Sequence, residues 1–422
     1  MYAMEANVSK YTNAIGSGKQ AITQGQKRKG GRGMREGWEY KKLGEVASSE
    51  LGKTLNKSKD TGKLYPYICA VNVLWDMIDL TILKHAFFEK EEIDRYSVRK
   101  GDLLVCEGGD TGRSAIWEKE EPVLYQNALH RVRFTTEMEA RFAMYCLWHL
   151  KNKGQIDQKY SKGVTIKHLV KSSLLSIELP VPPLSTQQSI VSELDKINEL
   201  ISLKKEQLKD YDNLAQSIFY EMFGDPVVNE KGWEVKKLRE VCECITDGDH
   251  MPPPKSDKGV PFVTIGNINK ETRQIEFDKT FFVPKDYFDN IPYTKKPKQG
   301  DILYTVTGSY GIPLLIAYDK EFCFQRHIGL LRPNGLVNSI YLYMWASNKS
   351  VKGQADVVAT GIAQKTVSLN SLRGFNITLP PLPLQQLFAQ RIELIEKQKD
   401  EIKSTIADLE TLLASRMQYW FD

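Results

Sequence analysis

The sequence predicts an α+β protein made of two tandem, pseudo-symmetric domains, separated and closed by two long antiparallel coiled-coil helices. The first observation behind this fold class is an internal repeat. "GWEYKKLGEV" at residue 37 returns as "GWEVKKLREV" at residue 232, and "GDLLVCEGGDTG" at 101 returns as "GDILYTVTGSYG" at 300. The second observation is a repeated helix entrance, "PPLSTQQSIV" at 182 and "PPLPLQQLFA" at 380. Each repeat is therefore a stretch of mixed structure followed by one long helix.

The mixed stretches, 34–184 and 223–382, contain short β-branched and aromatic runs broken by Gly, Pro, Asn and Asp. This pattern is typical of strands joined by turns. Helical spacing occurs in "ARFAMYCLWHL" at 140–150 and in "SIYLYMWASN" at 339–348. We therefore expect two α+β domains with equivalent elements.

The two long helices are predicted at 185–222 and 383–422, where apolar residues recur in steps of three and four, as in a coiled-coil seam. Each helix has an apolar stripe that needs burial, and the other helix is the best available partner. An antiparallel pair would act as a spacer between the two domains. The seam is formed by Ile190, Leu194, Ile197, Ile201, Leu208, Ile218, Phe388, Ile392, Ile395, Ile402, Ile406, Leu409 and Leu413.

Composition bounds the class of protein. At 422 residues the chain is too long for one ordinary core, and its 41% hydrophobic and 26% charged residues are typical of a soluble globular protein. No stretch approaches the roughly 20 apolar residues of a membrane helix, so we expect a cytoplasmic protein without a membrane partner. The six cysteines form no C-x-x-C pair, which favours reduced thiols over a zinc site.

The net charge of +5 comes entirely from residues 1–33, which hold six basic groups and one acidic group. These residues lack an apolar period, so we expect a disordered basic extension, with a DNA-contacting arm as the alternative. At the other end, "MQYWFD" has two possible roles: packing on the base of a domain or contacting a partner subunit.

Together these motifs resemble the specificity subunits of Type I restriction-modification enzymes over residues 34–422. The resemblance is carried by the "GWE-x-KKL" starts, "DGDHMPPPKSDKGVPFVTIGNI" at 247–268, "GDILYTVTGSYG", "TGIAQKTVSLNSL" at 360–372 and the "PPL-x-x-QQ" entrances. The first repeat departs from the pattern, because "SSELGKTLNKS" at 48–58 stands where the second has "DGDH". Either the first domain uses a different recognition loop, or this element is not needed for reading.

The resemblance implies two target-recognition domains, each reading half of a bipartite, asymmetric sequence in double-stranded DNA, with the helices as a ruler. It also implies two methyltransferase (M) subunits, which carry S-adenosylmethionine and modify adenine. Restriction (R) subunits, which use ATP and Mg, would cleave the DNA. The chain itself would hold no cofactor or metal and would have no catalytic residues.

Two other functions stay open. One is an assembly scaffold that does not read DNA. The other is a self-contained DNA-modifying enzyme, against which stands the absence from the sequence of a [DNS]-P-P-[YF] methyltransferase motif and of a phosphate loop.

The "TDGDH" segment admits three interpretations. Asp247, Asp249 and His250 could bind a metal, but a glycine between short acidic residues followed by three prolines is typical of a turn. His250 could also contact DNA or order the loop. We favour the turn and keep His250 as a DNA-binding candidate.

The glycines at 108–112 and 308–311 predict a hairpin in each repeat, because neither segment has the spacing of a phosphate-binding loop. Polar residues at hairpin tips are candidates for groove contact. They are Asp110, Thr111, Arg113, Ser309 and Tyr310.

Side chains that suit base reading lie at aligned positions beside strands. Arginine reads guanine and glutamine or asparagine reads adenine through two hydrogen bonds each. The candidates are Gln126, Asn127, Arg131, Gln325 and Arg326, and a structural hydrogen bond is an equal alternative for each. Lysines that could hold DNA phosphates, or simply be solvated, are Lys53, Lys57, Lys59, Lys162, Lys167, Lys255, Lys258 and Lys365.

Overall fold

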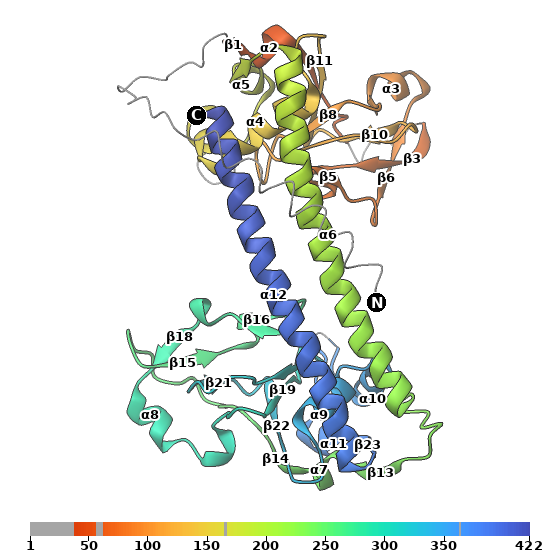
Figure 1. Ribbon diagram of the computed structural model, residues 1–422, viewed down its shortest axis with the longest axis vertical. Coiled ribbons are helices and arrows are strands. Elements are labelled where there is room, and N and C mark those ends of the chain that lie inside the picture. Colours follow the sequence, from red (N-terminus) through yellow and green to blue (C-terminus); the bar gives the residue numbers. More distant parts are fainter. Residues whose placement is uncertain (1–37, 56–61, 164–166, 363) are drawn as a thin grey trace, which may run out of the picture. The chain divides into compact units, whose positions relative to one another are not determined.

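The computed structural model describes residues 38–55, 62–163, 167–362 and 364–422, and it divides into two compact units (Figure 1). The first unit is Met1–Leu200 with Leu409–Asp422, and the second is Ile201–Asp408. Each unit therefore contains one α+β domain and a part of each long helix. The predicted extension at 1–33 lies outside the described residues, as do Lys57 and Lys59.

The first domain is built on two four-stranded sheets, with the orders β2-β11-β8-β9 and β6-β3-β10-β7. Strand β8 is buried at all four positions because helix α4 packs beside it and the core between the sheets takes its other face. The strands are β1 Glu39–Lys42, β2 Ala47–Leu51, β3 Lys63–Ile68, β4 Val73–Leu74, β5 Met77–Ile78, β6 Lys84–Phe88, β7 Ser97–Val98, β8 Leu103–Cys106, β9 Ser114–Ile116, β10 Val123–Tyr125, β11 Leu129–Phe134 and β12 Glu178–Val181. The helices are α2 Leu43–Val46, η2 Ala70–Asn72, α3 Lys90–Arg95, α4 Ala140–Asn152, η3 Ile156–Tyr160 and α5 Lys171–Leu175.

The second domain repeats this plan with a β14-β22-β19-β20 sheet and a smaller β18-β15-β21 sheet (Figure 1). Its strands are β13 Glu234–Lys237, β14 Cys242–Asp247, β15 Val260–Val263, β16 Ile268–Asn269, β17 Gln274–Ile275, β18 Phe281–Val283, β19 Ile302–Thr305, β20 Pro313–Leu315, β21 Cys323–Phe324, β22 Ile328–Pro333 and β23 Asn376–Leu379. Its helices are α7 Leu238–Val241, η4 Ile265–Asn267, η5 Phe277–Lys279, α8 Lys285–Asn290, η6 Tyr293–Lys295, α9 Ser339–Ala346, α10 Lys349–Val358 and α11 Leu369–Arg373.

The internal repeat is also present in the contacts that hold each domain together. Arg133 on β11 pairs with Asp102 before β8, at 2.6 Å, and Arg332 on β22 pairs with Asp301 before β19, at 2.8 Å. In both domains the sheet order brings the strand that carries the arginine next to the turn that carries the aspartate. That turn precedes β8 in the first domain and β19 in the second. The predicted α+β repeat is confirmed.

The long helices are α6, Leu184–Phe223, and α12, Leu382–Phe421. In the first unit Glu193, near the start of α6, pairs with Arg416, near the end of α12. In the second unit Asp212 pairs with Lys399 at 2.8 Å, and Phe219 stacks edge-on against Phe388. Within each unit the helices therefore run antiparallel, as predicted. No helix in the described part of the chain combines the length and apolar content of a membrane span.

Most residues of the predicted seam are buried. Ten of its residues are buried, namely Ile190, Leu194, Ile197, Ile201, Phe388, Ile392, Ile395, Ile402, Ile406 and Leu413. Leu208, Ile218 and Leu409 are partly buried. Between Ile201 and Leu208, Lys204 donates to Gln207 on the same helix at 3.0 Å.

The repeated "QQ" has a structural explanation that the sequence did not suggest. Gln187 is fully buried; its Oε1 accepts the Glu139 N–H at 2.8 Å, and its Nε2 donates to the Pro182 carbonyl at 2.9 Å. Gln385 is buried likewise and makes the equivalent bonds, with the Asn338 N–H and the Pro380 carbonyl, at 2.8 Å each. In each unit one glutamine side-chain amide therefore links the start of the long helix to the α+β domain that precedes it in the chain.

The C-terminal segment packs on the first domain, which is one of the two roles that the sequence left open. The ring of Phe421 lies 5.5 Å from that of Phe142 on α4. The Asp422 carboxylate pairs with His149 at 2.9 Å and with Lys153 at 2.6 Å. Both long helices thus contribute to the first unit.

A charged cluster joins the first domain to α6. The guanidinium of Arg141 contacts Asp76 at 2.9 Å and Asp195 on α6 at 2.7 Å. Asn198 donates to Asp76 at 3.0 Å, and the Tyr145 hydroxyl donates to Asp195 at 2.7 Å. Burial raises the pKa of Asp76 to about 6, outweighing the opposing effect of Arg141.

This pKa predicts that the first unit loses stability as the pH rises from about 4 to about 6. In that window the folded carboxyl of Asp76 holds a proton that the unfolded chain, with a pKa of 3.8, has released. Because the unfolded state releases this proton at a lower pH than the folded state does, raising the pH through this window favours unfolding. We expect the thermal midpoint of the wild type, measured against Asp76→Asn, to fall across this range. A difference that rises with pH would mean that the ion pair with Arg141 outweighs burial.

Candidate nucleic-acid interface

In each domain the chain crosses over a neighbouring strand end at a glycine. In the second domain Asp249 N donates to the Phe324 carbonyl at 2.9 Å, and Arg326 N donates to the Asp249 carbonyl at 3.1 Å. A side chain on Gly248 would place its Cβ 1.9 Å from the Phe324 oxygen. Only glycine allows this crossing, so the "DGDH" element is a backbone requirement as well as a set of polar side chains.

The first domain makes the same crossing with a different sequence. Lys53 N donates to the Tyr125 carbonyl at 3.1 Å, and Asn127 N donates to the Lys53 carbonyl at 3.0 Å. A Cβ on Gly52 would meet the Gln126 carbonyl at 2.5 Å. "LGKT" at 51–54 therefore occupies the place of "DGDH" at 247–250. The sequence placed the segment 48–58 opposite "DGDH" but did not show which residues correspond, because only the glycine is shared.

The residue after the glycine anchors a short helix in both domains, with reversed chemistry. Lys53 contacts Glu92 on α3 at 2.5 Å and donates to the Phe87 carbonyl at 2.8 Å. Asp249 accepts from the Tyr287 hydroxyl on α8 at 2.9 Å. The ammonium of Lys53 is thus engaged inside the domain, where it is neutralised by a carboxylate, which favours a structural role over phosphate contact.

The side chains beside the crossing differ between the domains. In the first, Gln126 donates to Asn127 at 2.6 Å and Asn127 donates to Thr54 at 3.2 Å. In the second, Gln325 is partly buried and Arg326 is exposed. Four of these residues were predicted from sequence, and the fold gathers them at equivalent edges. One edge presents amides and the other a guanidinium.

His250 stands at the exposed end of the second crossing, where its Nε2 lies 2.9 Å from Asp247. Lys295 lies 3.9 Å from the same carboxylate. This arrangement favours the interpretation in which His250 orders the loop. Within the described residues no group of three or more His, Cys, Asp or Glu side chains is placed to hold a metal ion.

Arg131 is 9% exposed, and its guanidinium donates to the backbone carbonyls of Arg95 at 2.8 Å and Ser97 at 2.6 Å. It therefore fastens one sheet of the first domain to the segment between α3 and β7. This placement favours the structural alternative over base reading.

The predicted hairpins are confirmed, because β8 pairs antiparallel with β9 and β19 with β20. Their tips are held in the same way. The Thr111 hydroxyl donates to Asp157 at 2.8 Å, and the Tyr310 hydroxyl donates to Asp356 at 2.8 Å. Thr111 is fully buried, so at this position only Tyr310, which is partly exposed, presents its side chain to solvent.

The other tip residues hold the hairpins in place. Asp110 pairs with Lys151 at 2.9 Å, and Arg113 donates to the Ala70 carbonyl at 2.9 Å. The Ser309 carbonyl accepts the Thr305 hydroxyl at 2.7 Å.

A lysine-bearing loop lies against each hairpin. His168 forms isolated β-bridges with Gly108 and with Lys162. In the equivalent loop Thr366 forms them with Thr307 and with Thr360. The side chains of Lys162, Lys167 and Lys365 are exposed in these loops, and Lys167 donates to the Asp157 carbonyl at 2.9 Å. The fold thus brings three of the predicted lysines beside the hairpin tips.

Lys255 and Lys258 lie elsewhere, on the exposed segment that precedes β15. The Lys255 ammonium is 5.1 Å from the centre of the Phe281 ring. A β-bridge between their segment and β18 places these two lysines near β18 and not beside the hairpin tip.

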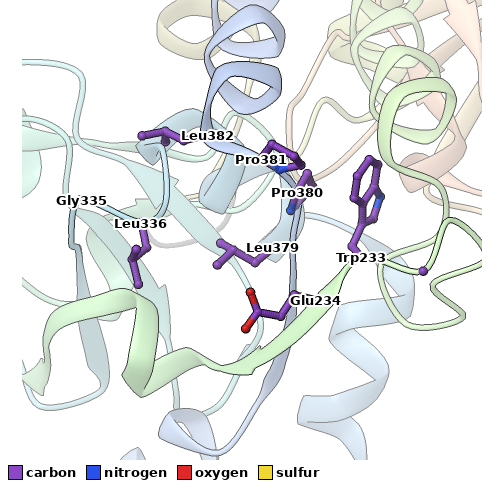
Figure 2. Close-up of a pocket in the computed structure, with 9 residues that line it drawn as sticks. Trp233, Glu234, Gly335, Leu336, Leu379, Pro380, Pro381 and Leu382 are labelled. Carbon is purple, nitrogen blue, oxygen red and sulfur yellow. The ribbon is translucent and has the colours of Figure 1, made fainter.

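A pocket of about 440 Å³ lies where the β13–β23 ribbon meets the start of α12 (Figure 2). Its wall is largely apolar, and Figure 2 shows Leu379 and Pro380 opposite Trp233. Glu234 is the one ionisable residue in its lining, and it pairs with Lys236 at 2.6 Å. This lining offers no acid, base and nucleophile set for catalysis.

Comparisons with known proteins agree with this architecture. The family model described as "Type I restriction modification DNA specificity domain" matches residues 35–210 and 230–411. The chain therefore belongs to this family. It is a specificity subunit of the Type I restriction-modification class, with two recognition domains.

Two relatives match most of the chain at low identity. The Type I restriction enzyme MjaVIII specificity subunit of Methanocaldococcus jannaschii is 23% identical, covering 90% of this chain and 92% of its own. The EcoBI specificity subunit of Escherichia coli is 21% identical, covering 74% and 70%.

Two solved structures share the fold. One, from work on complex assembly and conformational transition of the type I R-M system, has a TM-score of 0.55, with 18% identity, 91% of this chain and 97% of the other covered. The S subunit from M. genitalium has a TM-score of 0.50, with 15% identity and coverage of 94% and 98%.

Proposed function

We propose that this chain reads a bipartite, asymmetric site in double-stranded DNA, one half with each domain. One observation carries the proposal: the two domains share a backbone frame and present different side chains at equivalent places. Asn127 corresponds to Arg326 at the crossing, and at the hairpin tip the second domain presents Tyr310 where the first has the buried Thr111. A common frame with unequal contact residues suits two half-sites of unequal sequence.

The assignment of base contacts follows from chemistry at these edges. Arg326 is exposed, and an arginine suits the two acceptors of guanine. Burial lowers the pKa of the neighbouring His327, and the charge of Arg326 lowers it further, so this imidazole is neutral at pH 7. In the first domain Asn127 offers an amide, which suits adenine.

The chain would act without cofactor, metal or catalytic residues of its own. We infer that two methyltransferase subunits bind it and supply S-adenosylmethionine, and that restriction subunits supply ATP- and Mg-dependent cleavage. Such a complex would work in the cytoplasm, where its DNA is. The specificity-subunit name of a relative, and a structural neighbour from work on complex assembly of the type I R-M system, support a role within a multisubunit complex.

The test is to co-express the full chain with an M subunit and map methylated adenines in the host DNA. We expect one motif with two specified halves and a fixed gap. Arg326→Asn, which copies the first-domain residue, should relax one half only, since a lost bidentate contact costs about 1–3 kcal/mol of discrimination.

The matched variant Asn127→Arg should change the other half and leave the first intact. No motif, in a complex whose assembly is confirmed by purification, would favour the non-reading scaffold. Methylation by the full chain without an M subunit would favour the self-contained enzyme.

A further inference from the structure

A second pocket, of about 190 Å³, opens in the second unit between the β16–β17 turn, the β19–β20 hairpin and the junction of α9 with α10. Four cationic residues line it, namely Lys270, Arg273, Lys349 and Lys352. They come from separate segments, so no spacing in the sequence predicts that they lie together. The fold alone gathers these charges.

Three of the four cations have no carboxylate partner in the part of the chain that the structure describes. Arg273 donates to the Ser347 hydroxyl at 2.6 Å, which fixes its guanidinium at the pocket wall. Lys270 and Lys349 carry no ion pair there, whereas Lys352 pairs with Asp356 at 3.0 Å. The pocket therefore keeps a positive charge that its own surroundings leave uncompensated.

Neutral donors add to the charge. Asn348 caps the ten-residue helix α10, and it lines the pocket although it is only 1% exposed. Its Oδ1 accepts from the Ser350 N–H at 2.9 Å and the Tyr220 hydroxyl at 3.1 Å. Its Nδ2 has no acceptor among the described residues. A buried donor without a partner, at the positive end of a helix, favours an anion.

The equivalent corner of the first domain is filled. Trp75 in the β4–β5 turn stacks on Trp148 of α4, with ring centres 5.2 Å apart and planes 8° apart. Tyr145 also stacks against Trp148, with ring centres 6.2 Å apart. In the first domain aromatic rings occupy this corner, so the shared fold by itself does not require a cationic pocket there.

We propose that this pocket binds a phosphate group, and that the group is a phosphodiester of the DNA backbone beside the half-site of the second domain. The inference rests on the proposed function. Gly311, at the end of the hairpin tip, lines the pocket, and Lys352 lies 5.3 Å from the ring of Tyr310, a groove-contact candidate. A backbone phosphate held here would position the hairpin without reading sequence.

The test uses the full chain in complex with its M subunit and a duplex that contains the mapped motif. The variant is Lys270→Gln with Lys349→Gln, and the control, matched in charge, is Lys209→Gln with Lys397→Gln on exposed helix faces. Binding is measured over a series of salt concentrations. We expect the pocket variant to bind more weakly, with a salt slope smaller by about 0.9 for the one phosphate lost.

The methylated motif should be the same in the pocket variant and the wild type, because a phosphate contact carries no sequence information. An unchanged slope and affinity would overturn the inference. So would stabilisation of the wild type, and not of the variant, by inorganic phosphate with no change in DNA binding, since the pocket would then serve a free anion. Failure of the proposed function is distinct, because the wild type would itself give no motif.

Discussion

Replacing Asp301 by alanine is expected to destabilise the second unit by about 3–5 kcal/mol. Asp301 and Arg332 are each 1% exposed, and the carboxylate accepts two bonds from the guanidinium, at 3.0 and 2.8 Å. Removing it leaves a buried positive charge without its counter-ion. Denaturant unfolding of the full chain, followed by a signal from the second unit, measures the loss.

The first domain supplies a matched control. Asp102 makes the same pair with Arg133, whose side chain is 39% exposed. Water can solvate that guanidinium when the carboxylate is removed, so Asp102→Ala should cost clearly less. Equal losses in the two variants would contradict the argument from burial.

Replacing Phe388 by alanine is expected to cost about 3–5 kcal/mol through the cavity it leaves in the second unit. Phe388 is fully buried on α12, and its ring lies 5.1 Å from Phe223 and 5.7 Å from Phe219 on α6. These contacts hold the start of one long helix to the end of the other. Thermal and denaturant unfolding of the variant would measure the effect.

The adjacent Leu387 is 44% exposed on the same helix turn, so Leu387→Ala is the control and should change stability little. Phe388→Ala should also weaken reading of the second half-site, because the domain is anchored on this helix pair. A stable Phe388→Ala protein would mean that the long helices are held mainly by other contacts.

The repeat made much of the fold predictable. Motifs repeated at offsets of 195 to 199 residues, and apolar residues in steps of three and four, are visible in the sequence alone, so the two domains and the helix seam could be predicted. The alternation of strands and turns likewise predicted the hairpins at 108–112 and 308–311. The same order could not show that Gln187 and Gln385 are buried clamps, because their partners lie in other segments.

The candidate interface was only partly predictable. Composition and position identified the polar residues at the crossing and hairpin tips. Whether a lysine or arginine faces solvent depends on distant residues: Glu92 draws Lys53 inward, and the carbonyls of Arg95 and Ser97 hold Arg131. The residue-by-residue match of the first domain to "DGDH" could not be predicted, because the steric requirement at the crossing is met by one glycine and the two segments share no other residue.

By itself the sequence determined the duplication and the apolar stripes of the helix pair, because these follow from repeated motifs and periodic burial. The class of protein followed from the resemblance of these motifs to a known family. Only the tertiary structure decided which charged side chains are paired within the fold and which remain available to a ligand. The cationic pocket shows the physical reason. Its charges lie up to 82 residues apart, between 270 and 352, and become a site only when folding brings them around one space.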